Sequence, residues 1–306
     1  MSSRHSEVIV VGGGPAGLSS ALYLARYARS VAVFDAGHGR STHHQVNHNY
    51  LGFPGGVPAV KLRELGRQQL GEYAHVTCRD ERVASLRRDG EGFVAVSASG
   101  EHRAEAVILC TGVRDHYPHF PNWEDYVGRT MFWCLTCDGY ANRGRRVVVV
   151  GHTDAAACEA LQLTRFTDRV TVLTNRDDDD LSQPVRERLD AVGIQVVSDR
   201  IQEVRGSGGH FRSITTGAGR ELPLEVLFSL QGTTAEAGLA EGLGLQLSDD
   251  GWITVNSEQC TNVPGVYAAG DVTRLHAHQV ATAVHEGGQA ACAANYHLYP
   301  PGLRLD

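Results

Sequence analysis

A glycine-rich turn between two apolar runs constrains the fold of this chain more than any other feature. The run Glu7–Val11 is almost continuously apolar, as expected of a parallel strand that is buried on both faces. It leads directly into Gly12-Gly13-Gly14-Pro15-Ala16-Gly17, and residues 18–29 then have helical periodicity. Residues 30–35 form a second apolar run that ends in Asp35. A Gly-x-Gly-x-x-Gly turn in this setting predicts a βαβ dinucleotide-binding unit.

Each glycine of the turn has its own expected task. Gly12 permits the tight turn, Gly14 lets the backbone approach a pyrophosphate, and Gly17 lets helix and strand pack closely. The N-terminus of the following helix directs unpaired N–H groups at the phosphates. Asp35 is expected to accept hydrogen bonds from a ribose diol.

The same pattern recurs in the middle of the chain. Residues 145–150 are expected to form a strand that ends at Gly151, residues 154–166 have helical periodicity, and residues 169–173 are expected to form another strand. Between the two units, residues 93–99 alternate as in an antiparallel strand, and residues 105–112 are expected to return to the first sheet. The sequence therefore predicts an α/β fold with two Rossmann-like nucleotide-binding domains.

Charge and hydropathy exclude several classes of function. A net charge of −7 over 306 residues argues against nucleic acid as a main partner. No apolar run approaches the roughly 20 residues that span a bilayer, so we expect no membrane segment. The first residues lead straight into the strand that begins at Glu7 and do not resemble a signal peptide. We therefore expect a cytoplasmic protein.

The cysteines indicate redox chemistry and argue against a metal site. Seven cysteines are scattered along the chain, and Cys134 and Cys137 are the one close pair. Structural zinc usually takes four ligands, often from two such pairs, so we expect no metal. A Cys-x-x-Cys pair near βαβ units favours thiol–disulfide exchange, and the adjacent Asp138 can move the proton that this exchange requires. The alternative is two packed cysteines, because free cysteine is often buried.

Taken together, these motifs resemble the low-molecular-weight thioredoxin reductase family of flavoproteins. Four further stretches carry the resemblance along nearly the whole chain: Cys110-Thr111-Gly112, where the family usually has Ala-Thr-Gly; Cys134 to Gly139; Val263 to Asp271; and His278 to Ala283, where the family usually has Arg-Gln. The resemblance implies the pyridine nucleotide-disulfide oxidoreductase fold. It implies an FAD-binding domain formed by residues 1–115 and 245–306, and an NADPH-binding-like domain, residues 116–244, that carries the cysteine pair.

The resemblance also implies roles for individual residues. Cys137 faces the flavin, Cys134 attacks the substrate disulfide, and Asp138 moves the proton. Asp271 contacts the ribityl-phosphate region, and Gln279 and Val280 contact the isoalloxazine. The expected FAD-binding residues are Gly12, Gly14, Pro15, Ala16, Gly17, Asp35, Asn49, Val83, Thr111, Gly112, Gly270, Asp271, His278, Gln279 and Val280. The implied partner is thioredoxin or another dithiol substrate, and the implied assembly is a homodimer.

The second nucleotide site departs from the family pattern. Where NADPH-dependent members have Gly-x-Gly-x-x-Ala, this chain has Gly151-His152-Thr153-Asp154-Ala155-Ala156. A branched side chain at Thr153 occupies space that a pyrophosphate needs. In the family, basic residues hold the 2′-phosphate of NADPH. Here four acids, Asp177 to Asp180, follow Arg176 instead. Their carboxylates are expected to repel the phosphate, unless they form a solvated loop that points away. We therefore expect an electron donor other than NADPH, with ferredoxin as one candidate.

Two other functions remain open from the sequence. One is a small-molecule dithiol oxidase of the gliotoxin and holomycin type, which passes electrons from a dithiol through flavin to oxygen. In that branch histidine commonly follows the second cysteine, and Asp138 in this position favours the reductase. The other is a flavin-bound redox sensor without turnover. We also expect that Tyr296, His297 or Tyr299 in the C-terminal segment covers a flavin, or else that this segment is ordinary surface.

Overall fold

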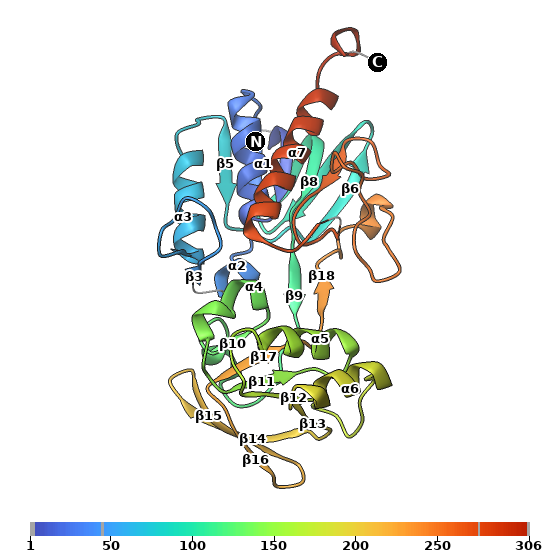
Figure 1. Ribbon diagram of the computed structural model, residues 1–306. Coiled ribbons are helices and arrows are strands. Elements are labelled where there is room, and N and C mark those ends of the chain that lie inside the picture. The colour runs from blue at the N-terminus through green and yellow to red at the C-terminus, as the bar shows by residue number, and fades with distance from the viewer. Residues whose placement is uncertain (1–3, 44–45, 275, 305–306) are drawn as a thin grey trace. The chain divides into compact units, whose positions relative to one another are not determined.

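The computed structural model describes residues 4–43, 46–274 and 276–304. The chain forms two compact units, which are drawn in Figure 1. The first contains Met1–Thr42, Ala59–Arg114 and Thr234–Asp306, and the second contains His43–Pro58 and Asp115–Thr233. Each unit has its own sheet and its own hydrophobic cores.

The first unit is built on a mixed sheet with a parallel centre. Its strands are β1 (His5–Val11), β2 (Val31–Phe34), β5 (Val76–Arg79), β6 (Ser85–Asp89), β7 (Gly92–Ser97), β8 (Gly100–Leu109) and β19 (Val266–Ala268). The order is β5-β2-β1-β8-β7-β6, and β19 also pairs with β8. Strands β5, β2, β1, β8 and β19 run parallel to one another, whereas β7 pairs antiparallel with both β8 and β6. The predicted βαβ unit is therefore present.

Strand β1 separates two cores, which explains its continuous apolar sequence. Val8 and Val10 pack into one core with residues of the helices α1 (Pro15–Arg26) and α7 (Val280–His297). Ile9 packs into the opposite core with Leu243 and other residues of the 240–253 region. Because successive side chains of a strand point to opposite faces, both sets must be apolar.

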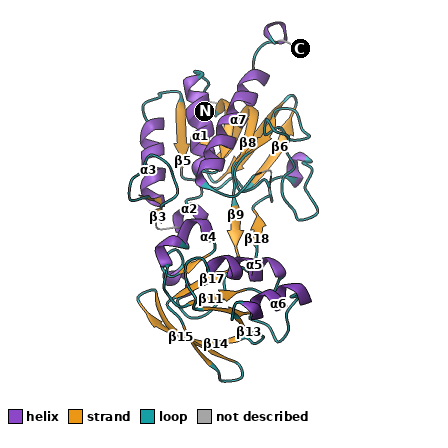
Figure 2. Ribbon diagram, in the orientation of Figure 1, coloured by secondary structure: helices purple, strands orange, loops and turns teal. Residues whose placement is uncertain are grey.

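Helices cover one face of this sheet, as Figure 2 shows. The helical segments of the first unit are α1, α3 (Ala59–Leu70), α7 and the single turns η3 (Glu241–Leu243) and η4 (Pro301–Leu303). The short α2 (Arg40–His43) ends at the boundary between the units. Helix α1 packs against α7, and Gly287 of α7 lets this happen, because a Cβ there would lie 2.2 Å from the carbonyl oxygen of Ala16.

The second unit repeats the parallel βαβ arrangement. Its sheet contains β10 (Met131–Phe132), β17 (Val226–Ser229), β11 (Val147–Val150), β12 (Val170–Leu173) and β13 (Gln195–Val197), in that order and all parallel. Val147 and Val149 pack against the helices α5 (Asp154–Leu163) and α6 (Gln183–Ala191). Val148 and Val150 belong to the core on the opposite face. Strand β11 is thus buried on both sides, as β1 is.

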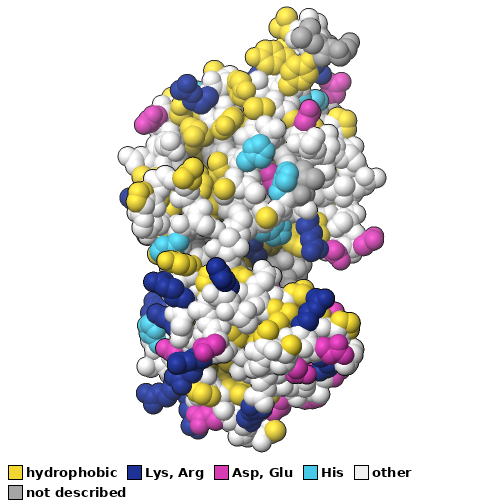
Figure 3. Space-filling view, in the orientation of Figure 1, with side chains coloured by type: hydrophobic (Ala, Val, Ile, Leu, Met, Phe, Trp, Pro, Cys, Tyr) yellow, Lys and Arg dark blue, Asp and Glu magenta, His cyan; other side chains and the backbone are white. Residues whose placement is uncertain are grey.

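The second unit also contains smaller elements that complete its cores and carry the cysteine pair. A separate antiparallel sheet, formed by β14 (Ile201–Ser207), β15 (His210–Thr216) and β16 (Glu221–Pro223), contributes side chains to the core behind β11. The short elements are β3 (Val46–Asn47), β4 (Val57–Pro58), α4 (Leu135–Asp138), η1 (Trp123–Tyr126) and η2 (Tyr140–Asn142). On the face drawn in Figure 3, both basic and acidic side chains are exposed over this unit.

The boundaries of the two units differ from the expected domain ranges at two places. The chain passes between the units along β9 (Val113–Asp115) and β18 (Thr233–Ala235), which pair with each other. Residues 234–244 group with the first unit rather than the second, because Ala240 and Leu243 lie in the core that contains Ile9. Residues 43–58, expected in the first domain, group with the second unit. No helix among the described residues is long and apolar enough to cross a membrane.

Candidate functional site: two dinucleotide turns and a disulfide

The first dinucleotide turn has the geometry that its glycines predict. Gly12 has a φ of +115°, and a Cβ there would lie 2.1 Å from the carbonyl oxygen of Cys110. A Cβ on Gly17 would lie 1.8 Å from the carbonyl oxygen of Gly12. Gly14 differs, because a Cβ there would meet no atom closer than Ser41 Oγ, at 3.8 Å. Gly12 and Gly17 are therefore required by packing, whereas Gly14 leaves open space above the turn.

Helix α1 begins at this turn with free donors. Gly14 is its N-cap, Pro15 is its first residue, and among the described residues no side chain caps the helix. The first turn also contains no acidic residue. Backbone N–H groups at a helix N-terminus bind phosphate readily. The turn therefore fits the pyrophosphate of a dinucleotide, as the sequence predicts.

Asp35 lies at the end of β2 in a more crowded setting than the sequence suggests. Its Oδ2 accepts a 2.6 Å hydrogen bond from Arg63 of α3, and its Oδ1 accepts the N–H of Gly37 at 3.0 Å. A Cβ on Gly13 would lie 2.1 Å from Asp35 Oδ2, so this third glycine is also required. Arg63 Nε further donates to the Gly13 carbonyl oxygen at 3.3 Å. No sequence pattern marks Arg63, because its partners come from distant segments.

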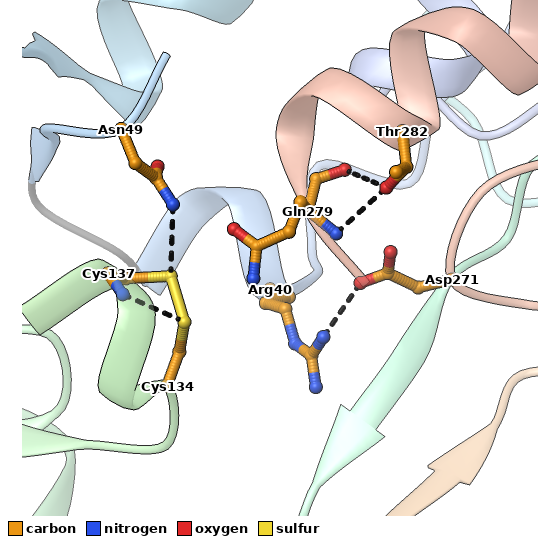
Figure 4. The surroundings of a disulfide bond; sticks show 7 residues. All are labelled: Arg40, Asn49, Cys134, Cys137, Asp271, Gln279 and Thr282. Carbon is orange, nitrogen blue, oxygen red and sulfur yellow. Dashed lines mark hydrogen bonds and ion pairs between the residues drawn. A yellow bond between two sulfur atoms is a disulfide. The ribbon is translucent and has the colours of Figure 1, made fainter. Parts of the chain in front are cut away.

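The second half of the expected FAD site lies in the same unit, around the N-terminus of α7. Asp271 Oδ2 accepts a 2.8 Å hydrogen bond from Arg40, shown in Figure 4. The N–H of Gly270 donates to the buried carboxylate of Glu286 at 2.7 Å, and the other oxygen of that carboxylate lies 2.9 Å from His276 Nδ1. Arg40 and Glu286 were not predicted from the sequence. Both fix the Gly270–Asp271 loop.

The remaining predicted FAD residues occupy varied positions in the first unit. Gln279 is the N-cap of α7, and its N–H lies 3.1 Å from Thr282 Oγ1. His278 Nε2 lies 2.9 Å from the carbonyl oxygen of Thr273, and its ring contacts Trp252. The other predicted residues are Pro15 and Ala16 in the first turn of α1, Val83 in the core, Thr111 and Gly112 after β8, and Val280 at the start of α7.

The C-terminal aromatic segment lies at the other end of α7 from Gln279 and Val280, and its covering of a flavin stays a prediction. Gln279 and Val280 lie at the first turn of α7, whereas Tyr296 and His297 lie in its last turn. With a rise of about 1.5 Å per residue, the two ends are roughly 27 Å apart. Tyr299 instead lies beneath the guanidinium group of Arg29, 5.1 Å from ring centre to Cζ.

In the second unit, Cys134 and Cys137 form a disulfide at the start of α4, with a Cα–Cα separation of 5.3 Å. Cys134 is the N-cap of this turn, and its Sγ accepts the N–H of Cys137 at 3.1 Å. Asn49 Nδ2 lies 3.8 Å from Cys137 Sγ and donates to it (Figure 4). Asn49, expected at the FAD site, therefore contacts the redox sulfur within the second unit.

Asp138 follows the disulfide and is buried, with 5% of its surface exposed. Burial raises the pKa of its carboxyl group to about 8, because the charged form loses its hydration. Asn142 Nδ2 donates to the Asp138 carbonyl oxygen at 2.8 Å and holds the end of the turn. A carboxyl group with this pKa can both donate and accept a proton near neutral pH.

Aromatic side chains of the second unit, among them Trp133, which directly precedes Cys134, pack together at one of its cores. The ring of Trp133 lies 6.0 Å from that of Tyr117, and Tyr117 lies 5.4 Å from Trp123. His119 joins this group through an edge-on contact with Trp123, in which the two ring centroids lie 5.0 Å apart. We call these four residues the aromatic cluster.

The second dinucleotide turn is tied to the acidic segment, Asp177 to Asp180. The N–H of Asp180 donates to the carbonyl oxygen of His152 at 2.8 Å, and Thr153 and Asp180 form a parallel bridge. Just after the acidic segment, the N–H of Ser182 donates to the carboxylate of Asp154 at 2.8 Å, and this hydrogen bond lowers the pKa of the Asp154 carboxyl group. Thr153 is the N-cap of α5. The segment that follows β12 is thus fastened to the turn where a pyrophosphate would bind.

The four carboxylates of the acidic segment are paired rather than free. Asp177 pairs with Arg200, Asp178 with Arg176, Asp179 with Arg186, and Asp180 with both Arg176 and His152. The Asp179 side chain is largely buried. Burial acts to raise the pKa of its carboxyl group, but the hydrogen bonds from Arg186, Leu181 and Ser198 lower this pKa overall. The expectation of four repelling charges is therefore too simple, because three arginines offset them. The residue of the acidic segment that bonds to the turn is Asp180, an acid where the family has basic residues.

The described residues contain no group of three or more histidine, cysteine or acidic side chains that could hold a metal ion. The free cysteines are Cys78, Cys110, Cys158, Cys260 and Cys292. Burial raises the pKa of the Cys110 thiol to about 12, so it is unreactive near neutral pH. Cys134 and Cys137 form the disulfide of the second unit, whereas Cys158 of that unit is an exposed free cysteine.

Comparisons with known proteins agree with this geometry. A family model described as pyridine nucleotide-disulphide oxidoreductase matches residues 6–287. Thioredoxin reductase from Treponema pallidum is 32% identical over 301 residues, which cover 95% of this chain and 97% of that protein. Thioredoxin reductase from Streptomyces coelicolor is 34% identical over 304 residues, 95% of this chain and 94% of that protein. The crystal structure of thioredoxin reductase from Streptococcus pyogenes superposes with a TM-score of 0.90 at 26% identity and covers 97% of this chain and 99% of that one.

Proposed function

Because the chain belongs to the pyridine nucleotide-disulphide oxidoreductase family and is a thioredoxin-reductase-like flavoenzyme, we propose that it reduces thioredoxin or a similar dithiol protein through Cys134 and Cys137. The observation that carries this proposal is the disulfide at the start of α4, with the buried carboxyl group of Asp138 next to it. A disulfide beside a group that exchanges protons near neutral pH is suited to reversible thiol chemistry.

FAD is the cofactor of this family, and the first unit fits it. Gly12, Gly14 and Gly17 with the start of α1 form the turn for the pyrophosphate, and the Gly270–Asp271 loop lies in the same unit. The flavin supplies two-electron transfer to or from a disulfide when it is bound. We propose that Asp35 and Asp271, held by Arg63 and Arg40, orient polar groups of the cofactor.

The chain's own residues supply the thiol chemistry. In the reduced pair, the Cys134 thiolate attacks one sulfur of the partner's disulfide, and the other partner sulfur leaves as a thiolate. The Cys137 thiolate then attacks Cys134, breaks the mixed disulfide and releases the second partner sulfur. The protein pair ends as a disulfide and the partner as a dithiol. Asp138 takes the proton from the attacking thiol and returns it to a leaving thiolate, which its raised pKa permits.

We further propose that NADPH is not the electron donor. Thr153 stands where the family has glycine, and the N–H of Asp180 is bonded to the carbonyl oxygen of His152 at the same turn. Asp180 puts a carboxylate near the place where a 2′-phosphate requires a cation. Ferredoxin or another low-potential donor fits these observations. The homodimer and the cytoplasmic location stay predictions.

A small-molecule dithiol oxidase is the second candidate function. It would use the same flavin and the same cysteine pair with electrons flowing in the opposite direction. Hydrogen peroxide formed from a small dithiol in air would support the oxidase. Unchanged cysteines with every reductant would support a redox sensor without turnover.

The test of the proposed function is capture of the mixed disulfide. In the Cys137→Ser variant, Cys134 attacks the partner but nothing resolves the product, so thioredoxin should remain attached until dithiothreitol is added. The Cys158→Ser variant is the matched control, because Cys158 is an exposed free cysteine of the same unit. Failure of the Cys137→Ser variant to trap thioredoxin would contradict this choice of partner.

A further inference from the structure

The two sulfurs of the disulfide have different hydrogen-bond donors. Cys134 Sγ accepts the backbone N–H of Cys137 at 3.1 Å, whereas Cys137 Sγ accepts the side-chain amide of Asn49 at 3.8 Å (Figure 4). The first donor belongs to the α4 turn itself and is present with any side chain. The second comes from a segment that is 88 residues away in the sequence.

The segment that carries Asn49 is held in place by its own contacts. Strands β3 and β4 pair through Val46 with Pro58 and through Asn47 with Val57, so they close the loop between them. Within that loop the rings of Tyr50 and Phe53 stack at 5.7 Å. The amide of Asn49 is therefore presented by an ordered loop.

From this placement we infer that Asn49 is a positioning residue for the redox pair, which stabilises negative charge on Cys137 Sγ when the disulfide opens. A neutral disulfide sulfur accepts a hydrogen bond weakly, whereas a thiolate accepts it strongly. The amide thus favours the reduced pair over the oxidised pair. It stabilises the charge on Cys137, the sulfur that leaves when Cys134 Sγ is attacked, whereas Cys134 has the backbone donor of the α4 turn. This inference rests on the proposed function of the pair.

The chemistry can be followed with dithiothreitol as the reductant. One of its thiolates attacks Cys134 Sγ, the protein S–S bond breaks, and Cys137 leaves as a thiolate beside the Asn49 amide. The second thiol of the reagent then displaces Cys134 and closes the cyclic disulfide. Two electrons and two protons pass from the reagent to the protein pair.

The first measurement is the reactivity of Cys137 alone. In a Cys134→Ser background, alkylation of Cys137 by iodoacetamide at pH 7 is followed by peptide mass spectrometry, because the rate follows the thiolate fraction. Asn49→Asp replaces the donor with an isosteric carboxylate and should slow alkylation about tenfold, since a charged hydrogen bond is lost and a like charge is added. Asn49→Leu removes only the donor and should slow it about threefold.

Leu51→Asp is the matched control. Leu51 is 95% exposed and lies two residues from Asn49, so this variant adds the same charge to the same loop without replacing the amide. Its alkylation rate should stay within twofold of the parent. Equal slowing by Leu51→Asp and Asn49→Asp would overturn the inference. Alkylation rates of both Asn49 variants within twofold of the parent would overturn it as well.

The second measurement is the equilibrium of the intact pair with dithiothreitol buffers. Asn49→Asp should shift the equilibrium toward the disulfide about tenfold at pH 7, which is about 30 mV for two electrons. If the wild-type disulfide fails to reduce and reoxidise reversibly, the proposed function falls. The alkylation experiment in the Cys134→Ser background still decides the role of Asn49 in that case, so the two failures are distinguishable.

Discussion

The N–H of Asp180 donates a 2.8 Å hydrogen bond to the carbonyl oxygen of His152. This bond fastens the segment after β12 to the second dinucleotide turn. In a dinucleotide-binding unit, that turn and the end of the second strand hold the pyrophosphate and the adenosine ribose. The bond places Asp180 at this turn, next to Thr153, which stands where the family has glycine.

Restoring the missing groups should restore binding of NADPH. The double variant Thr153→Gly/Asp180→Arg removes the branched side chain and replaces an acid with a cation for the 2′-phosphate. We expect its Kd for NADPH, measured by calorimetry, to fall at least tenfold, or about 1.4 kcal/mol. Thr153→Gly/Asp168→Arg is the control, because the Asp168 side chain is 96% exposed and the charge change is the same. Equal gains in both double variants would reject a site-specific effect.

Alanine at two glycines should separate cofactor binding from folding. At Gly14 the backbone is extended and a Cβ meets nothing closer than 3.8 Å, so Gly14→Ala should leave the unfolding of the apoprotein unchanged. The same Cβ points into space that the pyrophosphate needs, so flavin content should fall several-fold. Gly17→Ala places its Cβ 1.8 Å from a carbonyl oxygen and should destabilise the apoprotein by about 1–3 kcal/mol.

These two variants are read by flavin absorbance relative to protein and by urea unfolding of the apoprotein. A Gly14→Ala protein that retains full flavin would show that the pyrophosphate does not approach this turn. A Gly17→Ala protein as stable as wild type would show that α1 can shift without cost.

Stability should depend on pH through Asp138. Its pKa is raised from 3.8 to about 8 in the folded protein, so between these values the folded state holds a proton that the unfolded state has released. The free energy of unfolding therefore falls as pH rises from 4 to 8, by at most about 1.4 kcal/mol per pH unit, and then levels off. Asp138→Asn does not ionise and should remove this part of the slope.

Urea unfolding of wild type and Asp138→Asn at pH 5, 6, 7, 8 and 9 checks the sign. The free energy of unfolding of Asp138→Asn, relative to that of wild type, should rise as the pH increases to 8. Glu124→Gln is the control, because it removes an acid from the same unit. Parallel curves for wild type and Asp138→Asn would mean that Asp138 is ionised throughout the folded state.

The strands and the glycine turns could be predicted from the sequence because they depend on local patterns. Apolar runs buried on both faces identified β1 and β11. Helix ends were less accurate. Helix α1 begins at Pro15 rather than Leu18, because proline suits the first turn. It ends at Arg26 rather than Arg29, because Ala28 has a φ of +58°.

The partners of the site residues could not be predicted, because they come from distant segments. Arg63 reaches Asp35 from another helix, and the backbone of Asp180 reaches His152. The acidic run looks like a free, repelling surface in the sequence, yet each carboxylate has an arginine or histidine nearby. Such pairing depends on tertiary structure and leaves no periodic signal.

The most direct test of the proposed electron route is an anaerobic titration of the purified flavoprotein, with flavin absorbance as the readout. NADPH, NADH and dithiothreitol are added to separate samples, and the Cys134→Ser variant is the control for the thiol route. We expect dithiothreitol to bleach the flavin of wild type but not of the variant, and NADPH and NADH to leave both unchanged. Rapid bleaching of wild type by NADPH would contradict this route and make the chain an NADPH-dependent thioredoxin reductase.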